Sequence, residues 1–275
     1  MLEKKWDEGK FVCVGLDTEL EKIPEAARRD TIAGSIVNFN RIIIGATANL
    51  VCAFKPNSAF YEAEDVDGLK ALVETTTYIR QHYPEVPIIL DAKRADIGNT
   101  NRGYVVSAFG VIQADAITLH PYLGREALQP FLDDKDKGCI ILCKTSNPGA
   151  GEFQDVNVET LGVGHLPLYK IVADQVARKW NTLGNCALVA GATYPEELGA
   201  IRKIVGDMPL LIPGIGAQQG DVEKTVKNGM DSRKKGMIIN SSRGIIFASK
   251  GGPNIGPAAR EETLRLSEEI NKYRR

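Results

Sequence analysis

Eight short apolar runs are spread along the chain and alternate with segments of helical character. The runs are almost free of polar side chains, a pattern typical of strands buried on both faces of a parallel sheet. The predicted strands are Phe11–Leu16, Leu50–Phe54, Ile88–Leu90, Ala116–Leu119, Gly138–Cys143, Ala187–Ala190, Leu210–Ile212 and Gly236–Ile239. The predicted helices are Pro24–Ala48, Val66–Tyr83, Asn99–Ile112, Gly124–Leu132, Leu166–Leu183, Pro195–Val205, Gln219–Asn228 and Pro257–Tyr273.

This alternation favours an α/β fold of the (β/α)8 TIM barrel type, whose usual length of about 250 residues is close to the 275 residues of this chain. An open doubly wound sheet is the alternative. It normally has a glycine-rich phosphate turn after its first strand, and the sequence GLDT at 15–18 offers a single glycine. No composition break or linker divides the chain, so we predict one domain over residues 1–275.

One connection is unusually long. Between the fifth predicted strand and its helix, residues 146–166 read SNPGAGEFQDVNVETLGVGHL, a segment rich in glycine and polar side chains. Loops of this length without secondary structure are uncommon and are usually functional or disordered. In a barrel this segment would lie at the face where active sites are built. We therefore predict that residues 146–166 form an active-site lid.

Charge and composition exclude several classes of partner. The 34 Lys and Arg residues nearly balance the 35 Asp and Glu residues, which argues against nucleic acid or an anionic membrane as the main partner. No run approaches the roughly 20 apolar residues of a membrane span, and the N-terminal MLEKKWDEGK lacks the apolar region of a signal peptide. The five cysteines lack a CxxC pair, and most lie in apolar runs. We expect a soluble cytoplasmic protein with reduced thiols.

Polar residues cluster where the predicted strands end, as the active site of a barrel requires. The densest group is DAKRAD at 91–96. Because strand side chains alternate between faces, Asp91 and Lys93 are expected on one side, where Lys55 from a neighbouring strand can join them. Carboxylates beside lysines keep the lysines protonated, which makes them proton donors. A salt-bridge network that only satisfies charges at the rim is the alternative.

A second polar group follows the last two predicted strands. It consists of PGIGAQQG at 213–220 and NSSRG at 240–244. Glycines let backbone N–H groups approach an anion, and Arg243 can supply a bidentate guanidinium. Phosphate sites after the seventh and eighth strands recur in barrels, so we predict one here, with ordinary glycine-rich turns as the alternative. The three histidines show no metal-binding spacing, and no metal site is predicted.

Several of these segments resemble the orotidine 5′-phosphate decarboxylase family. They are DAKRADIGNT at 91–100, GLD at 15–17, FKPNSAFYE at 54–62, PGIGAQQGD at 213–221 and NSSRGI at 240–245. The resemblance covers about residues 10–273, and its spacing is similar to the bacterial-type subgroup called type 2. It implies a carboxy-lyase that converts orotidine 5′-monophosphate to UMP and CO2, the last step of de novo pyrimidine nucleotide synthesis, with no metal or organic cofactor.

The resemblance also implies a role for each matching residue. Lys93 matches the lysine that protonates pyrimidine carbon 6, and Asp91 the carboxylate beside the departing CO2. Lys55 and Asp96 match the rest of the catalytic array. The family is homodimeric, so Asp96 and Thr100 are expected to reach the partner's site.

The substrate-binding residues implied in the same way are Asp17 for the ribose, Thr100 for the ribose side from the partner, Ser146 for the pyrimidine, and Gly216, Gln218, Arg243 and Gly244 for the phosphate. Gln219 departs from the glycine common at that position, which changes the turn but removes no functional group.

Two alternative functions share parts of the pattern. The DxKxxD motif also occurs in related Mg²⁺-dependent barrels that decarboxylate 3-keto-gulonate 6-phosphate. A catalytically silent nucleotide-phosphate-binding barrel is the other alternative, and the complete set of charged residues at 55, 91, 93 and 96 argues against it.

Overall fold

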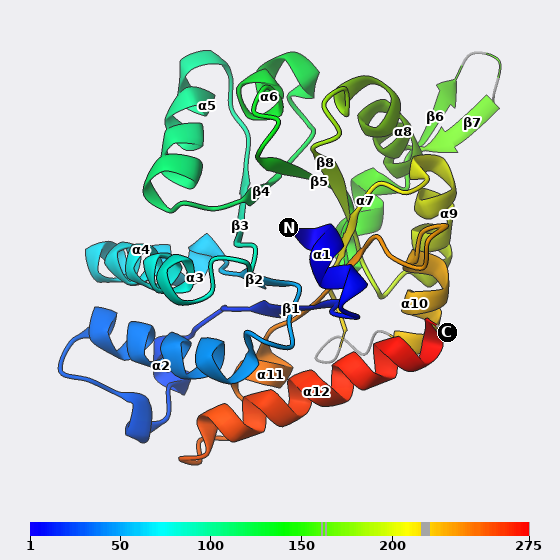
Figure 1. The fold of residues 1–275 in the computed structure, drawn as a ribbon. Helices are drawn as coiled ribbons and strands as arrows, with labels where there is room; N and C mark the ends of the chain where they lie inside the picture. The colour runs from blue at the N-terminus through cyan, green and yellow to red at the C-terminus, as the bar shows by residue number, and fades with distance from the viewer. Residues whose placement is uncertain (161, 163, 216–220, 275) are drawn as a thin grey trace. The chain divides into compact units, whose positions relative to one another are not determined.

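The computed structural model describes residues 1–160, 162, 164–215 and 221–274. Eight of its strands form one sheet in the order β2-β1-β10-β9-β8-β5-β4-β3. Figure 1 labels six of them, β1 to β5 and β8. Backbone bridges Phe54↔Ile88 and Asn57↔Asp91 join the two ends of that order. The hairpin of β6 and β7 lies outside this sheet. Within the sheet the first strand, β1, neighbours the last, β10, and all other neighbours follow one another along the chain, which is the strand circuit of a (β/α)8 barrel and confirms the predicted fold class.

The strands of this sheet coincide with the eight predicted apolar runs to within a few residues. They are β1 (Val12–Gly15), β2 (Ala53–Lys55), β3 (Ile89–Arg94), β4 (Ala116–Leu119), β5 (Gly138–Lys144), β8 (Cys186–Ala190), β9 (Leu210–Ile212) and β10 (Met237–Ser241). Pairing is parallel where the register is defined, as in Cys13↔Ala53 and Leu188↔Leu210. The strand interiors are buried, as parallel sheets require.

The main helices follow the strands in turn. They are α2 (Ile32–Thr47), α4 (Asp65–His82), α5 (Gly98–Val105), α6 (Gly124–Leu132), α8 (Leu168–Gln175), α9 (Pro195–Val205), α10 (Val222–Gly229) and α12 (Ile255–Tyr273). Turns of π-helix, Val106–Val111 and Val176–Trp180, extend α5 and α8. None of the helices among the described residues is long and apolar enough to cross a membrane.

The predicted start of the first long helix was wrong. The helix begins at Ile32 rather than Pro24, because the Thr31 side chain accepts a hydrogen bond from the backbone N–H of Gly34 and caps it there. The residues before Thr31 include a short 3₁₀ turn, Glu25–Ala27. Four short helices were not predicted: α1 (Leu2–Asp7), α3 (Ser58–Glu62), α7 (Gly151–Gln154) and α11 (Arg243–Ile246).

The chain divides into two compact units. The first comprises Met1–Ala92, Val106–Ile117 and Asn240–Lys272, and the second Lys93–Val105, Thr118–Ile239 and Tyr273–Arg275. In the first unit α4 packs against α2 and α3, and in the second α9 packs against α8 and α10. All five cysteines are buried and free, in agreement with the position of most of them in apolar runs.

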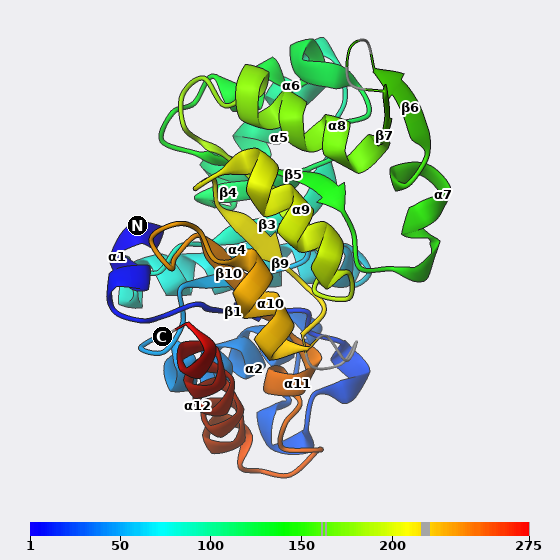
Figure 2. The ribbon, with the colours of Figure 1, turned by 90° about the vertical axis from the view of Figure 1, so that its right-hand side faces the viewer.

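The long connection at 146–166 has more secondary structure than its composition indicated. It contains a 3₁₀ turn (Pro148–Ala150), α7, and an antiparallel hairpin of β6 (Asn157–Thr160) and β7 (Gly164–Pro167), shown in Figure 2. The hairpin also shortens the helix predicted from Leu166, because α8 begins at Leu168. The side chain of Gln154 accepts from the backbone N–H of Thr145 and donates to its hydroxyl, which ties α7 to the end of β5.

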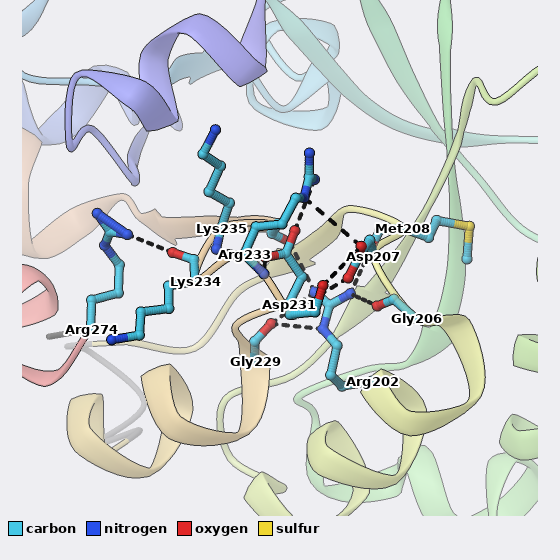
Figure 3. Close-up of polar contacts among 12 residues, drawn as sticks. Arg202, Gly206, Asp207, Met208, Gly229, Asp231, Arg233, Lys234, Lys235 and Arg274 are labelled. Atoms are coloured by element: carbon cyan, nitrogen blue, oxygen red, sulfur yellow. Dashed lines mark hydrogen bonds and ion pairs between the residues drawn. The ribbon is translucent and has the colours of Figure 1, made fainter.

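Arg202 in the last turn of α9 joins two connections of the second unit. Its buried guanidinium donates to the carbonyl oxygens of Gly206, Met208, Gly229 and Gly236 (Figure 3). Burial lowers the pKa of Arg202 to about 10, against the opposing effect of Asp231 and Asp207. Gly206 and Met208 lie just before β9, Gly229 ends α10, and Gly236 directly precedes β10. One side chain therefore holds the segments that lead into both strands.

Candidate active site

Lys55 at the end of β2 is the charged centre of the first unit. The residue is 3% exposed. Its Nζ donates to Oδ2 of Asp91 at 2.9 Å and lies 3.8 Å from Oδ1 of Asp17. Burial alone lowers the pKa of a lysine, but the Asp91 and Asp17 carboxylates outweigh it and raise the pKa of Lys55 above its usual value. The Lys55 side chain is therefore a fixed cation.

Asp91 is held at the point where β2 and β3 meet. Its backbone N–H donates to the carbonyl oxygen of Pro56 at 2.9 Å, and the residue is 8% exposed. This bond aligns the ends of the two strands, so the short distance between Lys55 and Asp91 follows from the sheet register. The structure thus brings together three of the predicted site residues, Asp17, Lys55 and Asp91.

The first unit contains two buried oxygens that can only accept and that have no hydrogen-bond donor among the described residues. They are Oδ1 of Asp17, after β1, and Oδ1 of Asn240, in β10. A Cβ at Gly15 would lie 1.9 Å from Oγ of Ser242 and 3.3 Å from Oδ1 of Asp17, so only glycine permits this close approach. Buried acceptors ordinarily find a donor, and a ligand with hydroxyl groups can supply it.

Arg243 and Gly244 lie in the same unit, separated from the end of β10 by Ser242. Both are exposed at the start of α11. The predicted phosphate residues Gly216 and Gln218 lie outside the described residues, so the structure describes the predicted phosphate site only on the β10 side.

Lys93 belongs to the second unit and has an unusual backbone. Its φ is 47°, in the left-handed region that side chains other than glycine rarely adopt. The backbone N–H of Lys93 donates to Oγ1 of Thr118 at 2.9 Å, which helps to hold this conformation. Strain of this kind costs about 1–3 kcal/mol and occurs preferentially at functional sites.

The turn that carries Asp96 is fixed by a buried asparagine. Asn101 accepts from the backbone N–H of Asp96 and donates to the carbonyl oxygens of Asp96 and Ala127. Asp96 itself is half-buried, and Thr100 is exposed in the first turn of α5. Sequence reasoning did not identify Asn101, whose role depends on a contact with α6.

Ser146 is positioned by the end of the neighbouring strand. Its carbonyl oxygen accepts from Oγ1 of Thr193 at 3.2 Å, and a Cβ at Gly191 would lie 2.9 Å from Cα of Ser146. Lys144, two residues earlier, is 1% exposed and donates to Asp155 at 2.5 Å. The Lys144 ammonium also lies 4.6 Å from the ring centre of Tyr194. Sequence reasoning did not identify these contacts of Lys144.

Comparison with known families identifies the group to which these residues belong. The family described as "Orotidine 5'-phosphate decarboxylase / HUMPS family" matches residues 10–253. The chain belongs to this family. The match includes every candidate site residue, from Asp17 to Gly244.

Individual members of the orotidine 5′-phosphate decarboxylase family resemble the chain over nearly its full length. The orotidine 5′-phosphate decarboxylase of Cellvibrio japonicus (strain Ueda107) is 44% identical over 274 residues, which cover 99% of this chain and 97% of that protein. The solved OMP decarboxylase of Leishmania donovani is 35% identical with a TM-score of 0.83, covering 99% of this chain and 97% of that one. The UMP synthase of the same organism is 36% identical with a TM-score of 0.85, and the match spans 99% of this chain and 55% of that longer chain.

The described part of this family member contains no group of three or more His, Cys, Asp or Glu residues placed to hold a metal ion. Its clustered carboxylates, Asp17 and Asp91, instead face the ammonium of Lys55.

Proposed function

We propose that this protein decarboxylates orotidine 5′-monophosphate to UMP and CO2, the last step of de novo pyrimidine nucleotide synthesis. The observation that carries the proposal is the buried cluster of Asp17, Lys55 and Asp91 at the strand ends of a chain in this family. The relative from Cellvibrio japonicus named orotidine 5′-phosphate decarboxylase, 44% identical over nearly the whole chain, supports the same activity.

The chemistry requires a cation at the reacting carbon. Loss of CO2 from pyrimidine carbon 6 leaves a carbanion that no adjacent carbonyl delocalises, so a preorganised positive charge must stabilise it. We assign this role to Lys93, which then delivers a proton to the same carbon. Asp91 lies beside the departing carboxylate in this scheme, Lys55 holds Asp91, and Asp96 completes the charged array. No cofactor takes part.

The remaining site residues bind the parts of the substrate that do not react. In the proposal Asp17 accepts from ribose hydroxyls through its buried Oδ1, and Ser146 contacts the pyrimidine. Gly216, Gln218, Arg243 and Gly244 bind the phosphate. Binding energy from the phosphate is available to close the site over the reacting ring.

The proposal includes a single domain over residues 1–275 with residues 146–166 as the lid. The attachment of this segment supports that role. Lys144 contacts Asp155, and Gln154 contacts Thr145, so the segment is joined to the end of β5 close to Ser146. A cytoplasmic location is also proposed, because five buried free cysteines suit a reducing compartment.

An absorbance assay of orotidine 5′-monophosphate consumption tests the proposed function. The purified protein is expected to convert the substrate to UMP at a rate that EDTA does not change. Activity that EDTA abolishes and Mg²⁺ restores, with 3-keto-gulonate 6-phosphate as the better substrate, would assign the chain to the sugar-phosphate decarboxylases. UMP binding without turnover would assign it to the silent nucleotide-binding barrels.

The proposed assembly is a homodimer in which Asp96 and Thr100 reach the site of the partner. Apolar side chains near these residues are unusually exposed, with Ile97 62%, Tyr122 89% and Leu123 42% accessible. Exposed apolar groups on two adjoining connections are typical of a subunit interface.

Ile97→Asp is therefore expected to dissociate the dimer, because it places a charge in an apolar interface. Analytical ultracentrifugation should show a monomer, and turnover should fall at least about tenfold because the partner's residues are lost. Leu264→Asp, at an exposed apolar position of α12, is the matched control and should remain dimeric and active. A wild-type protein that sediments as a monomer with full activity would contradict the assembly.

A further inference from the structure

A buried network of polar side chains lies in the first unit beneath the turn that carries Asp17. Asn40 of α2 accepts from Oγ1 of Thr18 at 2.6 Å and donates to the hydroxyls of Tyr61 at 3.0 Å and Thr75 at 3.1 Å. The Tyr61 hydroxyl in turn donates to the carbonyl oxygen of Leu16 at 3.0 Å. All five residues are at most 1% exposed.

The network holds the backbone on both sides of Asp17. Leu16 precedes Asp17 and is bound through its carbonyl oxygen by Tyr61, while its N–H donates to the carbonyl oxygen of Lys55 at 3.1 Å. Thr18 follows Asp17 and is bound through its hydroxyl by Asn40. Asp17 is thus the one residue between two anchored neighbours, and its carboxylate points to Lys55.

The hydrogen bonds of Asn40 and Tyr61 have complementary directions. Asn40 uses both of its N–H groups and its carbonyl oxygen, and Tyr61 uses its hydroxyl once as acceptor and once as donor. Burial raises the pKa of Tyr61, so its hydroxyl keeps the proton that it donates. A buried network in which the amide and the phenol hydroxyl are both paired is rigid, whereas one missing member leaves a buried group unpaired.

Core stability alone does not account for this arrangement. Three helices, α2, α3 and α4, each contribute one polar side chain to the network. The hydrogen bonds that connect these helices to the end of β1 are made with the two neighbours of Asp17 in the chain. Apolar side chains of similar size would pack the same volume without the cost of burying four polar groups.

We propose that Tyr61, Asn40 and Thr18 are positioning residues for Asp17, which fix its carboxylate at Lys55 and at the ribose hydroxyls of the substrate. The inference rests on the proposed function, in which Asp17 binds the ribose. A displacement of about 1 Å in a positioning group can reduce efficiency up to about a hundredfold.

Tyr61→Phe tests the proposal because it removes a single hydroxyl. The KM for orotidine 5′-monophosphate is expected to rise about tenfold with kcat within about threefold of wild type, the pattern of lost substrate binding. In an Asp17→Ala background, Tyr61→Phe should raise KM by less than about twofold, because the residue that Tyr61 positions is absent. Hydrogen exchange at the amides of residues 16–18 should accelerate in Tyr61→Phe, a readout independent of turnover.

Thr47→Val is the matched control. Thr47 lies on the same helix as Asn40, is fully buried, and donates only to the carbonyl oxygen of Ile43. Thr47→Val should lower Tm about as much as Tyr61→Phe does, but it should leave KM and the hydrogen exchange at residues 16–18 unchanged. If Tyr61→Phe does not fold, Thr18→Val should show the same kinetic defect and Thr18→Ser should restore wild-type values.

The outcomes separate the inference from the proposed function. A wild-type protein that does not turn over orotidine 5′-monophosphate overturns the function, and the exchange data then still test the anchoring of Asp17. An active wild type in which Asp17→Ala is impaired but Tyr61→Phe changes only Tm overturns the inference. The inference is also overturned if Tyr61→Phe raises KM by the same factor in the wild-type and the Asp17→Ala backgrounds.

Discussion

Lys93→Ala is expected to abolish decarboxylation, with kcat at least about a thousandfold below wild type, because one side chain both stabilises the carbanion and protonates it. Product formation from orotidine 5′-monophosphate should be measured at saturating substrate over several hours. UMP binding, measured by calorimetry, should change little, because the product does not carry the charge that Lys93 stabilises. Near-normal turnover in Lys93→Ala would overturn the assignment of the proton donor.

The backbone at Lys93 provides a control for misfolding. Because φ is 47° at this residue, Lys93→Gly relieves a conformation that alanine still has to adopt. The glycine variant should keep a free energy of unfolding within about 1 kcal/mol of wild type and be equally inactive. Arg243→Ala gives the contrasting kinetic pattern, in which KM rises and kcat is less affected, because Arg243 is proposed to bind the distant phosphate.

Arg202→Met is expected to lower the free energy of unfolding by about 3–5 kcal/mol, because four buried carbonyl oxygens lose a charged donor at once. Met retains much of the aliphatic volume, so the loss reports the hydrogen bonds rather than a cavity. Urea denaturation followed by circular dichroism measures the change. Turnover at low temperature should stay within about twofold of wild type, because Arg202 acts before strands β9 and β10 rather than at their carboxyl ends.

Arg233→Met is the matched variant from the same cluster. The Arg233 side chain is 45% exposed and pairs with Asp231 at 2.9 Å (Figure 3). Partly exposed ion pairs contribute about 0–1 kcal/mol, so this variant should be almost as stable as wild type. Equal destabilisation by the two substitutions would show that the carbonyl contacts of Arg202 have no special importance.

Local patterns predicted the architecture well. Each strand of the barrel was visible as an apolar run, because burial on both faces leaves no place for polar side chains in the strand interior. Boundaries were less accurate where they depended on one side chain. The helix expected from Pro24 begins at Ile32 because the Thr31 side chain caps it there.

The candidate catalytic residues were also visible as polar positions at strand ends, and their roles came from the resemblance to a known family. The sequence pattern did not reveal the residues that hold these catalytic residues in position. Asn40 is one of several polar residues of α2, and its partners Thr18, Tyr61 and Thr75 are 22, 21 and 35 positions away. No periodicity relates residues at such separations.

Arg202 and Lys203 are a second case in which the sequence does not predict a tertiary contact. They are adjacent cations in the last turn of α9, and their sequence context does not distinguish them. In the structure Arg202 is buried against four carbonyl oxygens, while Lys203 is exposed.

The residue pattern alone therefore determined the order of strands and helices, the barrel class and the charged positions at the strand ends, because each depends on neighbours close in the chain. The pairing of Lys55 with Asp91 and Asp17, the anchoring of Asp17, and the burial of Arg202 were decided by tertiary structure. These contacts join residues from separate strands and helices, and only the register of the folded sheet and the packing of the helices bring such residues within hydrogen-bonding distance.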